Sequence, residues 1–215
     1  MDQFERRFKA YFTFHPVTTV ILIINLVMAL LVLFSGGFSL QNLIAWGGLV
    51  PPMVTELGDY YRILTAMALH GSILHVLMNC YVLYYIGGHL ERLIGPKRYA
   101  LVYLVSGILS SLFVVFFGAP NVVTVGASGA IFGVMGFLLV LTFKKPAWFP
   151  PQIAKSIRSL TLINLVITFL IPNISILGHL GGVISGALLA LILTPEEPDY
   201  LKHYIVENNE RYYQA

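Results

Sequence analysis

Four polar side chains stand inside long apolar runs of this sequence. Ser128 lies in a Gly-Ala-Ser-Gly-Ala stretch, and His179 lies in a Gly-His-Leu-Gly-Gly stretch. His75 and Asn79 occupy a third run, four residues apart, so both would project from one face of a helix. Polar side chains in such surroundings are costly and tend to mark function.

These residue types suit hydrolysis by a nucleophilic serine. A serine needs a neighbouring base to become a nucleophile, and His179 is the candidate on another run. Hydrolysis also needs donors directed at the developing oxyanion. The Asn79 amide and the His75 ring can supply them, as can the backbone N–H of Ser128 near a helix N-terminus.

The composition indicates that these elements lie in a membrane. Of 215 residues, 57% are hydrophobic and only 11% are charged, whereas soluble domains carry about 25% charged residues. With so few charges a soluble protein of this size could not cover its surface, so the surrounding solvent must be lipid. Cys80 is the single cysteine, which excludes an intrachain disulfide.

The apolar runs predict an all-α, polytopic bundle of six transmembrane helices over residues 17–193. A basic and aromatic segment, residues 1–16, precedes the bundle and is typical of a helix on an anionic membrane surface. A polar tail, residues 194–215, follows it. Ser39 is a candidate N-cap for a short helix in the long first connection. The expected spans cover residues 17–34, 73–88, 99–117, 128–143, 160–171 and 179–193.

The fourth span is short for a membrane. Residues 128–143 would make about 24 Å of helix at ~1.5 Å per residue, against a hydrocarbon core about 30 Å thick. Spans four and six should therefore begin below one membrane surface. Irregular backbone at that depth requires surrounding protein or a water-filled cavity, and hydrolysis inside a membrane would require such a cavity.

Lysine and arginine predict the orientation. They concentrate in the N-terminal segment and in the connections after spans two and four, while the opposite face holds only Arg62. The positive-inside rule then places both termini in the cytoplasm. Spans two, four and six all begin at the outer face, so the four polar side chains share one layer. The nearby carboxylates lie elsewhere, in the first loop or at the cytoplasmic end: Glu56, Asp59 and Glu91. A Ser–His dyad is therefore expected.

Each feature has a simpler structural explanation. Glycines four apart, such as Gly129 and Gly133, are common where membrane helices pack closely. A serine within a span often bonds its own backbone, and His75 with Asn79 could simply join helices. A metal site is disfavoured because cysteine and carboxylates lie outside the layer. The combination at one depth favours catalysis.

Together these motifs resemble the rhomboid family of intramembrane serine proteases. The similarity also includes Tyr61-Arg62 and His70 before the second span, and Leu90-Glu91 with Gly95 after it, and it covers about residues 17–193. The motifs are specific through their order and spacing.

The resemblance implies a function for each site residue. Ser128 matches the nucleophile, His179 the general base, and His75 and Asn79 the residues that help bind the oxyanion. Phe132 stands where some members carry a tyrosine against the catalytic histidine; phenylalanine keeps the ring without the hydroxyl. Tyr61 stands where tryptophan is more common.

The sequence thus predicts an intramembrane serine endopeptidase that cleaves peptide bonds in or near transmembrane segments of other proteins. No metal, organic cofactor or nucleic-acid partner is expected; the expected partners are membrane-protein substrates and the lipid bilayer. The charge pattern fits a bacterial plasma membrane, and an organelle membrane is compatible with it. Two rival functions use the same bundle: a catalytically silent chaperone or binding scaffold, and a small transporter.

Overall fold

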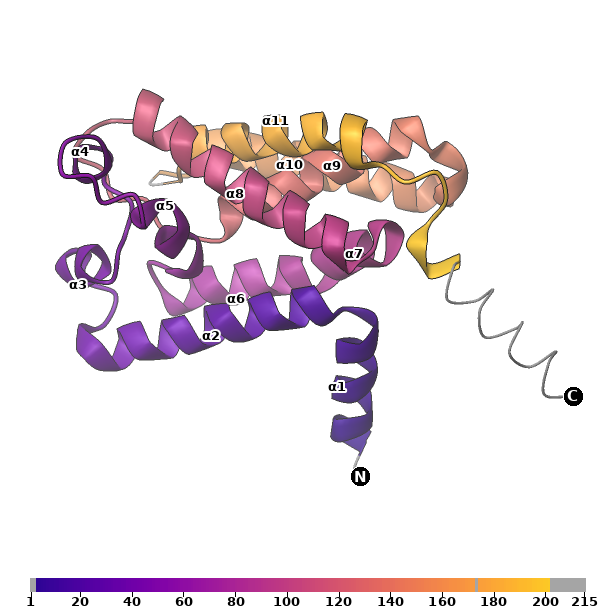
Figure 1. The fold of residues 1–215 in the computed structure, drawn as a ribbon, viewed down its shortest axis with the longest axis horizontal. Helices are drawn as coiled ribbons and strands as arrows, with labels where there is room; N and C mark the ends of the chain where they lie inside the picture. Colours follow the sequence, from indigo (N-terminus) through magenta and orange to yellow (C-terminus); the bar gives the residue numbers. More distant parts are fainter. Residues whose placement is uncertain (1–2, 173, 202–215) are drawn as a thin grey trace, which may run out of the picture.

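The computed structural model describes residues 3–172 and 174–201, and helices dominate this part of the chain (Figure 1). Proline is the first residue of the long helices α2, α8 and α10. Its missing N–H costs no hydrogen bond there, because the N–H at this position has no partner within the helix. The elements are α1 (Gln3–Phe14), α2 (Pro16–Gly36), α3 (Leu40–Ala45), α4 (Pro51–Thr55), α5 (Arg62–Thr65), the 3₁₀ turn η1 (Ala66–Ala68), α6 (Ile73–Val82), the π-helical turn η2 (Leu83–Gly87), α7 (Gly88–Ile94), α8 (Pro96–Phe117), α9 (Ser128–Lys144), the 3₁₀ turn η3 (Pro146–Trp148), α10 (Pro151–Leu170) and α11 (Ile176–Leu193).

Five helices among the described residues are long and apolar enough to cross a membrane: α2, the continuous helix Ile73–Ile94, α8, α10 and α11. The predicted fourth span, α9, is apolar but has 17 residues and falls short of this length. The all-helical, multi-span fold is therefore confirmed, whereas the number of six spans stays a prediction.

Three predicted span boundaries were wrong. The fifth helix begins at Pro151 instead of residue 160, because a proline at its first position starts the helix within the polar segment. The sixth begins at Ile176 instead of His179, since Ser175 accepts a hydrogen bond from the Gly178 N–H and caps it. The second continues through η2 and α7 to Ile94.

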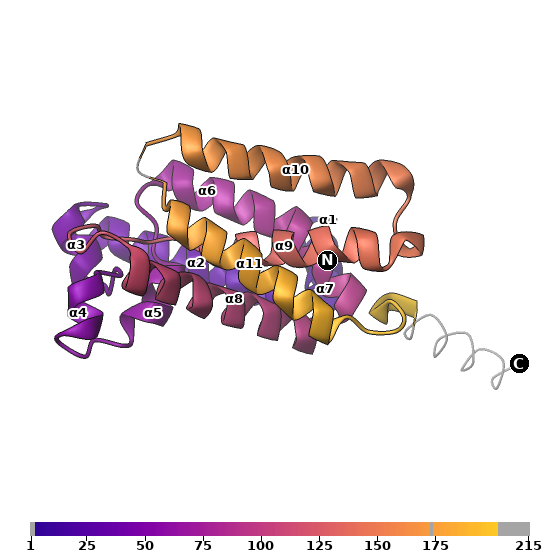
Figure 2. The ribbon, with the colours of Figure 1, turned by 90° about the horizontal axis from the view of Figure 1, so that it is seen from above.

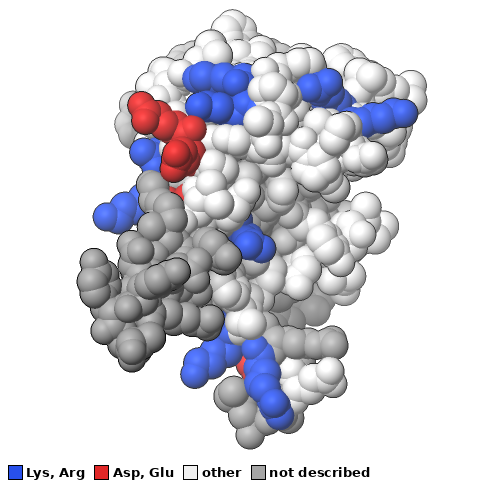
Figure 3. Space-filling model, turned by 90° about the vertical axis from the view of Figure 1, so that its right-hand side faces the viewer, with Lys and Arg blue, Asp and Glu red and all other residues white. Residues whose placement is uncertain are grey.

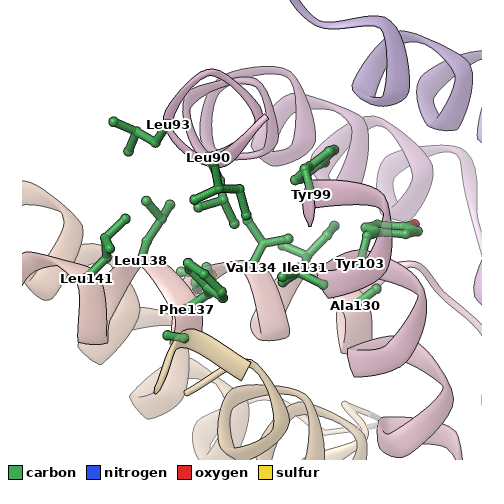
Figure 4. Packing of buried hydrophobic residues seen from close by; sticks show 14 of the residues in the cluster. Leu90, Leu93, Tyr99, Tyr103, Ala130, Ile131, Val134, Phe137, Leu138 and Leu141 are labelled. Carbon is green, nitrogen blue, oxygen red and sulfur yellow. The ribbon is translucent and has the colours of Figure 1, made fainter. Parts of the chain in front are cut away.

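Helix α9 forms the centre of the bundle and packs against α8, α10 and α11 (Figure 2). Its buried side chains meet those of α7 and α8 in the main hydrophobic core (Figure 4). The labelled residues in that core are Leu90, Leu93, Tyr99, Tyr103, Ala130, Ile131, Val134, Phe137, Leu138 and Leu141. The outer helices α2, α6 and α10 instead expose large apolar side chains, as a lipid-facing surface requires.

Glycines set the distance between α9 and α11. A Cβ placed on Gly186 would stand 1.8 Å from the carbonyl oxygen of Gly133, and one placed on Gly182 would stand 2.1 Å from the carbonyl oxygen of Gly129. Only residues without side chains permit such backbone contact. The close approach of these two helices, which the glycine spacing predicted, positions the first turn of α9 beside the first turns of α11.

Buried polar contacts fix the ends of other helices. Glu91 of α7 is 1% exposed and accepts hydrogen bonds from the backbone N–H groups of Val17 and Thr18, both at 2.8 Å, and from the Thr18 hydroxyl at 2.6 Å. The two N–H groups are donors of the first turn of α2 that have no partner within the helix, so the carboxylate caps that helix from a distant part of the chain.

The first connection is ordered around Arg62, which is 6% exposed. Its guanidinium donates to the carbonyl oxygens of Ile44 at 2.8 Å and Gly48 at 3.0 Å, and forms an ion pair with Asp59 at 2.9 Å. Ser39 caps α3 through the Asn42 N–H, as its sequence context predicted.

Lysine and arginine gather at one end of the bundle, the end that Figure 3 faces. This end contains the connections that the charge pattern assigned to the cytoplasm. Lys155 and Arg158, however, lie on α10 and not in a connection, which corrects the prediction. Lys144 donates to the last carbonyls of α11 and Arg158 to Thr142, so several cations also hold helix ends together.

Candidate active site

Ser128 is the first residue of α9, at the end of the long connection from α8. The chain enters the helix through Gly126, whose φ of 134° is in the region that favours glycine. Gly126 donates its N–H to the carbonyl oxygen of Ala66 at 2.9 Å, which fixes the turn to the first loop. The first N–H groups of a helix have no partner within it, so the first turn of α9, which Ser128 begins, offers free backbone donors.

His179 lies in the first turns of α11 and faces Ser128. Its Nε2 is 2.9 Å from the Ser128 Oγ, a hydrogen-bond distance between residues 51 apart in sequence. The imidazole is 8% exposed and stacks on the ring of Phe132, with 3.9 Å between ring centroids and 16° between their planes. The structure thus brings together the two side chains that the sequence singled out, with the aromatic ring expected beside them.

The other imidazole nitrogen has a partner that sequence reasoning missed. His179 Nδ1 is 2.8 Å from the hydroxyl oxygen of Thr168, which belongs to α10 and is 1% exposed. No motif surrounds this threonine. A usable signal existed nonetheless, because Thr168 lies near the end of α10 that the topology places at the depth of His179.

His75 and Asn79 share a face of α6 as predicted. A Cβ on Gly126 would stand 2.9 Å from the His75 ring and 3.4 Å from the Ser128 hydroxyl, so the imidazole lies beside the serine. His75 Nδ1 accepts a long hydrogen bond, 3.4 Å, from the Gly71 N–H. That bond favours the tautomer with a proton on Nε2.

Asn79 is 8% exposed, and its amide nitrogen is buried without a hydrogen-bond partner among the described residues. Buried amide donors are normally paired. The Asn79 amide is thus, in the described part of the chain, an unpaired donor one helical turn from His75.

His70 lies before α6 and contacts His75 edge to face, with 5.0 Å between ring centroids. Burial, followed by the neighbouring His75, lowers the pKa of His70 to about 3, so this ring is neutral at ordinary pH. Both of its nitrogens are buried. His70 is therefore a neutral packing neighbour of His75.

Two further features lie next to Ser128 and His179. Ser110 of α8 donates to the carbonyl oxygen of Gly178 at 2.7 Å and joins α8 to α11 just before His179. A cavity of about 20 Å³ reaches both Ser128 and His179, enough for about one water molecule. Among residues 3–172 and 174–201, no three His, Cys, Asp or Glu side chains come together as a metal site would require.

The fold and site define a polytopic helical membrane protein in which a serine and a histidine from two packed helices are hydrogen-bonded among further polar donors. Residues 57–196 match the rhomboid domain. The chain belongs to the rhomboid family, which confirms the resemblance noted in its motifs.

Three relatives show the range of the family. The chain is 35% identical over 169 residues to rhomboid protease GluP of Bacillus subtilis (strain 168), covering 78% of this chain and 32% of that one. It is 30% identical over 189 residues to putative rhomboid protease YdcA of the same organism, covering 86% of this chain and 92% of that one. Inactive RHOMBOID-like protein 8 of Arabidopsis thaliana is 35% identical over 151 residues, 69% of this chain and 42% of that one. The chain therefore spans a minor part of some relatives and nearly all of YdcA.

Proposed function

We propose that this protein is an intramembrane serine endopeptidase that cleaves peptide bonds in or near transmembrane segments of other membrane proteins. The observation that carries the proposal is the 2.9 Å contact between Ser128 Oγ and His179 Nε2 at the junction of two membrane helices. The names of the bacterial relatives support the same activity.

The proposed chemistry begins with the hydroxyl proton. His179 Nε2 accepts this proton as Ser128 Oγ attacks the carbonyl carbon of the scissile bond. The carbonyl oxygen becomes an oxyanion. His75 Nε2–H, the Asn79 amide and the N–H groups in the first turn of α9 are the donors directed at it. The protonated His179 then gives its proton to the leaving amine, which leaves an ester on Ser128. Water hydrolyses that ester with His179 again accepting a proton.

No charged group is needed to hold the base. An ionised carboxylate is costly at membrane depth, and none lies within hydrogen-bond distance of His179 in residues 3–172 and 174–201. We therefore propose a dyad, with Ser128 and His179 as catalytic residues and with His75 and Asn79 as oxyanion donors.

We further propose that six spans cross the membrane with the N-terminus in the cytoplasm. The concentration of Lys and Arg at one end supports this orientation (Figure 3). Single cysteines introduced at Asn121 and Lys97 test it: an impermeant reagent added outside intact cells should label position 121 and leave position 97 unlabelled. The reverse pattern would refute the orientation. Asn173 and residues 202–215, which include most of the predicted polar tail, lie outside the described residues.

A scaffold without catalysis is the second candidate, because one relative is named inactive. Both Ser128 and His179 are present in this chain, which favours the enzyme. A transporter would need a polar path across the bundle, and a flux assay in vesicles separates it from a protease.

The deciding experiment uses the purified protein in vesicles with a model transmembrane substrate. The wild type should cut it and Ser128→Ala should not, with an unchanged thermal melt. Ser185→Ala is the matched control, because Ser185 is a buried serine of α11 whose hydroxyl donates to the Gly181 carbonyl within its own helix. Equal cleavage by wild type and Ser128→Ala would refute the assignment; no cleavage by either would favour the scaffold.

A further inference from the structure

The hydrogen bonds of Thr168 determine which nitrogen of His179 carries the proton. Thr168 Oγ1 is 2.8 Å from the carbonyl oxygen of Asn164 and 2.8 Å from His179 Nδ1. A hydroxyl has a single proton to donate, and a carbonyl oxygen can only accept. The Thr168 proton is therefore directed to Asn164, and the Thr168 oxygen is left to accept from His179.

A neutral imidazole carries one N–H. If that proton is on Nδ1 and is donated to Thr168, then Nε2 is bare. Nε2 is the nitrogen that lies 2.9 Å from Ser128 Oγ, and a base must present a bare nitrogen to the hydroxyl whose proton it takes.

We propose that Thr168 is a positioning residue of the reaction, which fixes the tautomer and the orientation of His179 through Nδ1. The inference rests on the proposed function and extends it: hydrogen bonds link Thr168 of α10, His179 of α11 and Ser128 of α9. An acidic residue holds the histidine in the best-known serine proteases. A threonine can hold the same tautomer without placing a charge in the membrane.

The surroundings suit such a function. Thr168 is 1% exposed, so water does not compete for its oxygen. Phe132 fixes the plane of the imidazole by stacking, Ser128 occupies one nitrogen and Thr168 the other. Thr168 belongs to α10, whereas Ser128 and His179 belong to α9 and α11, so the position of α10 against α11 sets the state of the base.

Substitutions separate positioning from packing. Thr168→Val keeps the shape and removes the hydroxyl, whereas Thr168→Ser keeps the hydroxyl. The matched control is Thr161→Val: Thr161 is also 1% exposed on α10, and its hydroxyl donates to the Ile157 carbonyl of its own helix. We expect Thr168→Val to lower kcat about tenfold, the usual effect of losing one hydrogen bond, with KM nearly unchanged. Thr168→Ser and Thr161→Val should stay close to wild type.

The tautomer itself is measured by ¹⁵N NMR of histidine-labelled protein in lipid, with His179→Ala used to assign the signal. The Ser128→Ala background removes the serine hydroxyl and leaves the Thr168 hydroxyl as the hydrogen-bond partner of the ring. In that background, His179 should carry its proton on Nδ1, and adding Thr168→Val should produce a mixture of tautomers.

The two arms fail independently. If the wild type cleaves no substrate, the proposed function fails while the NMR arm still decides whether Thr168 sets the tautomer. Wild-type turnover by Thr168→Val, an equal loss in Thr168→Val and Thr161→Val, or an unchanged tautomer after Thr168→Val would each overturn the inference.

Discussion

Replacing Gly186 by alanine tests whether the contact between α9 and α11 creates the proposed site. The new Cβ would stand 1.8 Å from the carbonyl oxygen of Gly133 and 2.5 Å from its carbonyl carbon, and both are backbone atoms that no side-chain rotation can move. Ordinary contact begins near 3.4 Å. The helices must therefore separate locally by about 1.6 Å, the difference between these distances.

A separation of this size would reach the site, because Gly186 lies two turns from His179 on one continuous helix. The Ser128–His179 contact of 2.9 Å would stretch beyond hydrogen-bond distance. We expect a loss of about 10²-fold or more in the rate of fluorophosphonate labelling at Ser128, because general-base catalysis contributes about 10²–10⁴. Overpacking should also lower the free energy of unfolding by about 1–3 kcal/mol.

The assay compares Gly186→Ala with Ile184→Ala. Ile184 is 46% exposed and lies on the lipid-facing side of the same helix. Labelling rate and thermal melt are measured for both in the same lipid. Ile184→Ala should resemble the wild type in both measurements. If Gly186→Ala also keeps the wild-type labelling rate and melt, the backbone contact does not hold the site together and the reasoning is wrong.

Three further outcomes are expected. His179→Ala should eliminate most fluorophosphonate labelling of Ser128, which equal labelling of both proteins would contradict. Asn79→Ala and His75→Ala should each lower kcat more than they raise KM. The loss should be towards the low end of the 10²–10³-fold typical of one oxyanion donor, because the donors are redundant. Wild-type turnover by the double variant would exclude oxyanion binding by these two side chains. Glu91→Gln should lower the thermal melt, because an amide offers a single acceptor oxygen to the three donors of α2 that Glu91 now satisfies, and charged hydrogen bonds contribute about 1.5–3 kcal/mol each. An unchanged melt would show that this cap is dispensable.

The helical class, the membrane location and the candidate residues could all be predicted from the sequence. Apolar runs and the scarcity of charge are local properties of the chain, and they report directly on the solvent around each segment. The polar exceptions in those runs, Ser128, His179, His75 and Asn79, stood out for the same reason. Helix ends were less predictable: residues 151–159 were assigned to a polar connection although Pro151 begins a helix there.

The tertiary structure decided which of these side chains meet and what else joins them. The 2.9 Å contact between Ser128 and His179 depends on backbone packing between α9 and α11, which glycine spacing suggests but does not measure. No motif marks Thr168 in the sequence, and a threonine in a membrane helix ordinarily bonds its own backbone. Its second contact, with His179, arises only from the position of α10 beside α11. Hydropathy is a sum over neighbours in sequence, whereas a hydrogen bond across helices depends on their relative placement, and only the folded bundle fixes that placement.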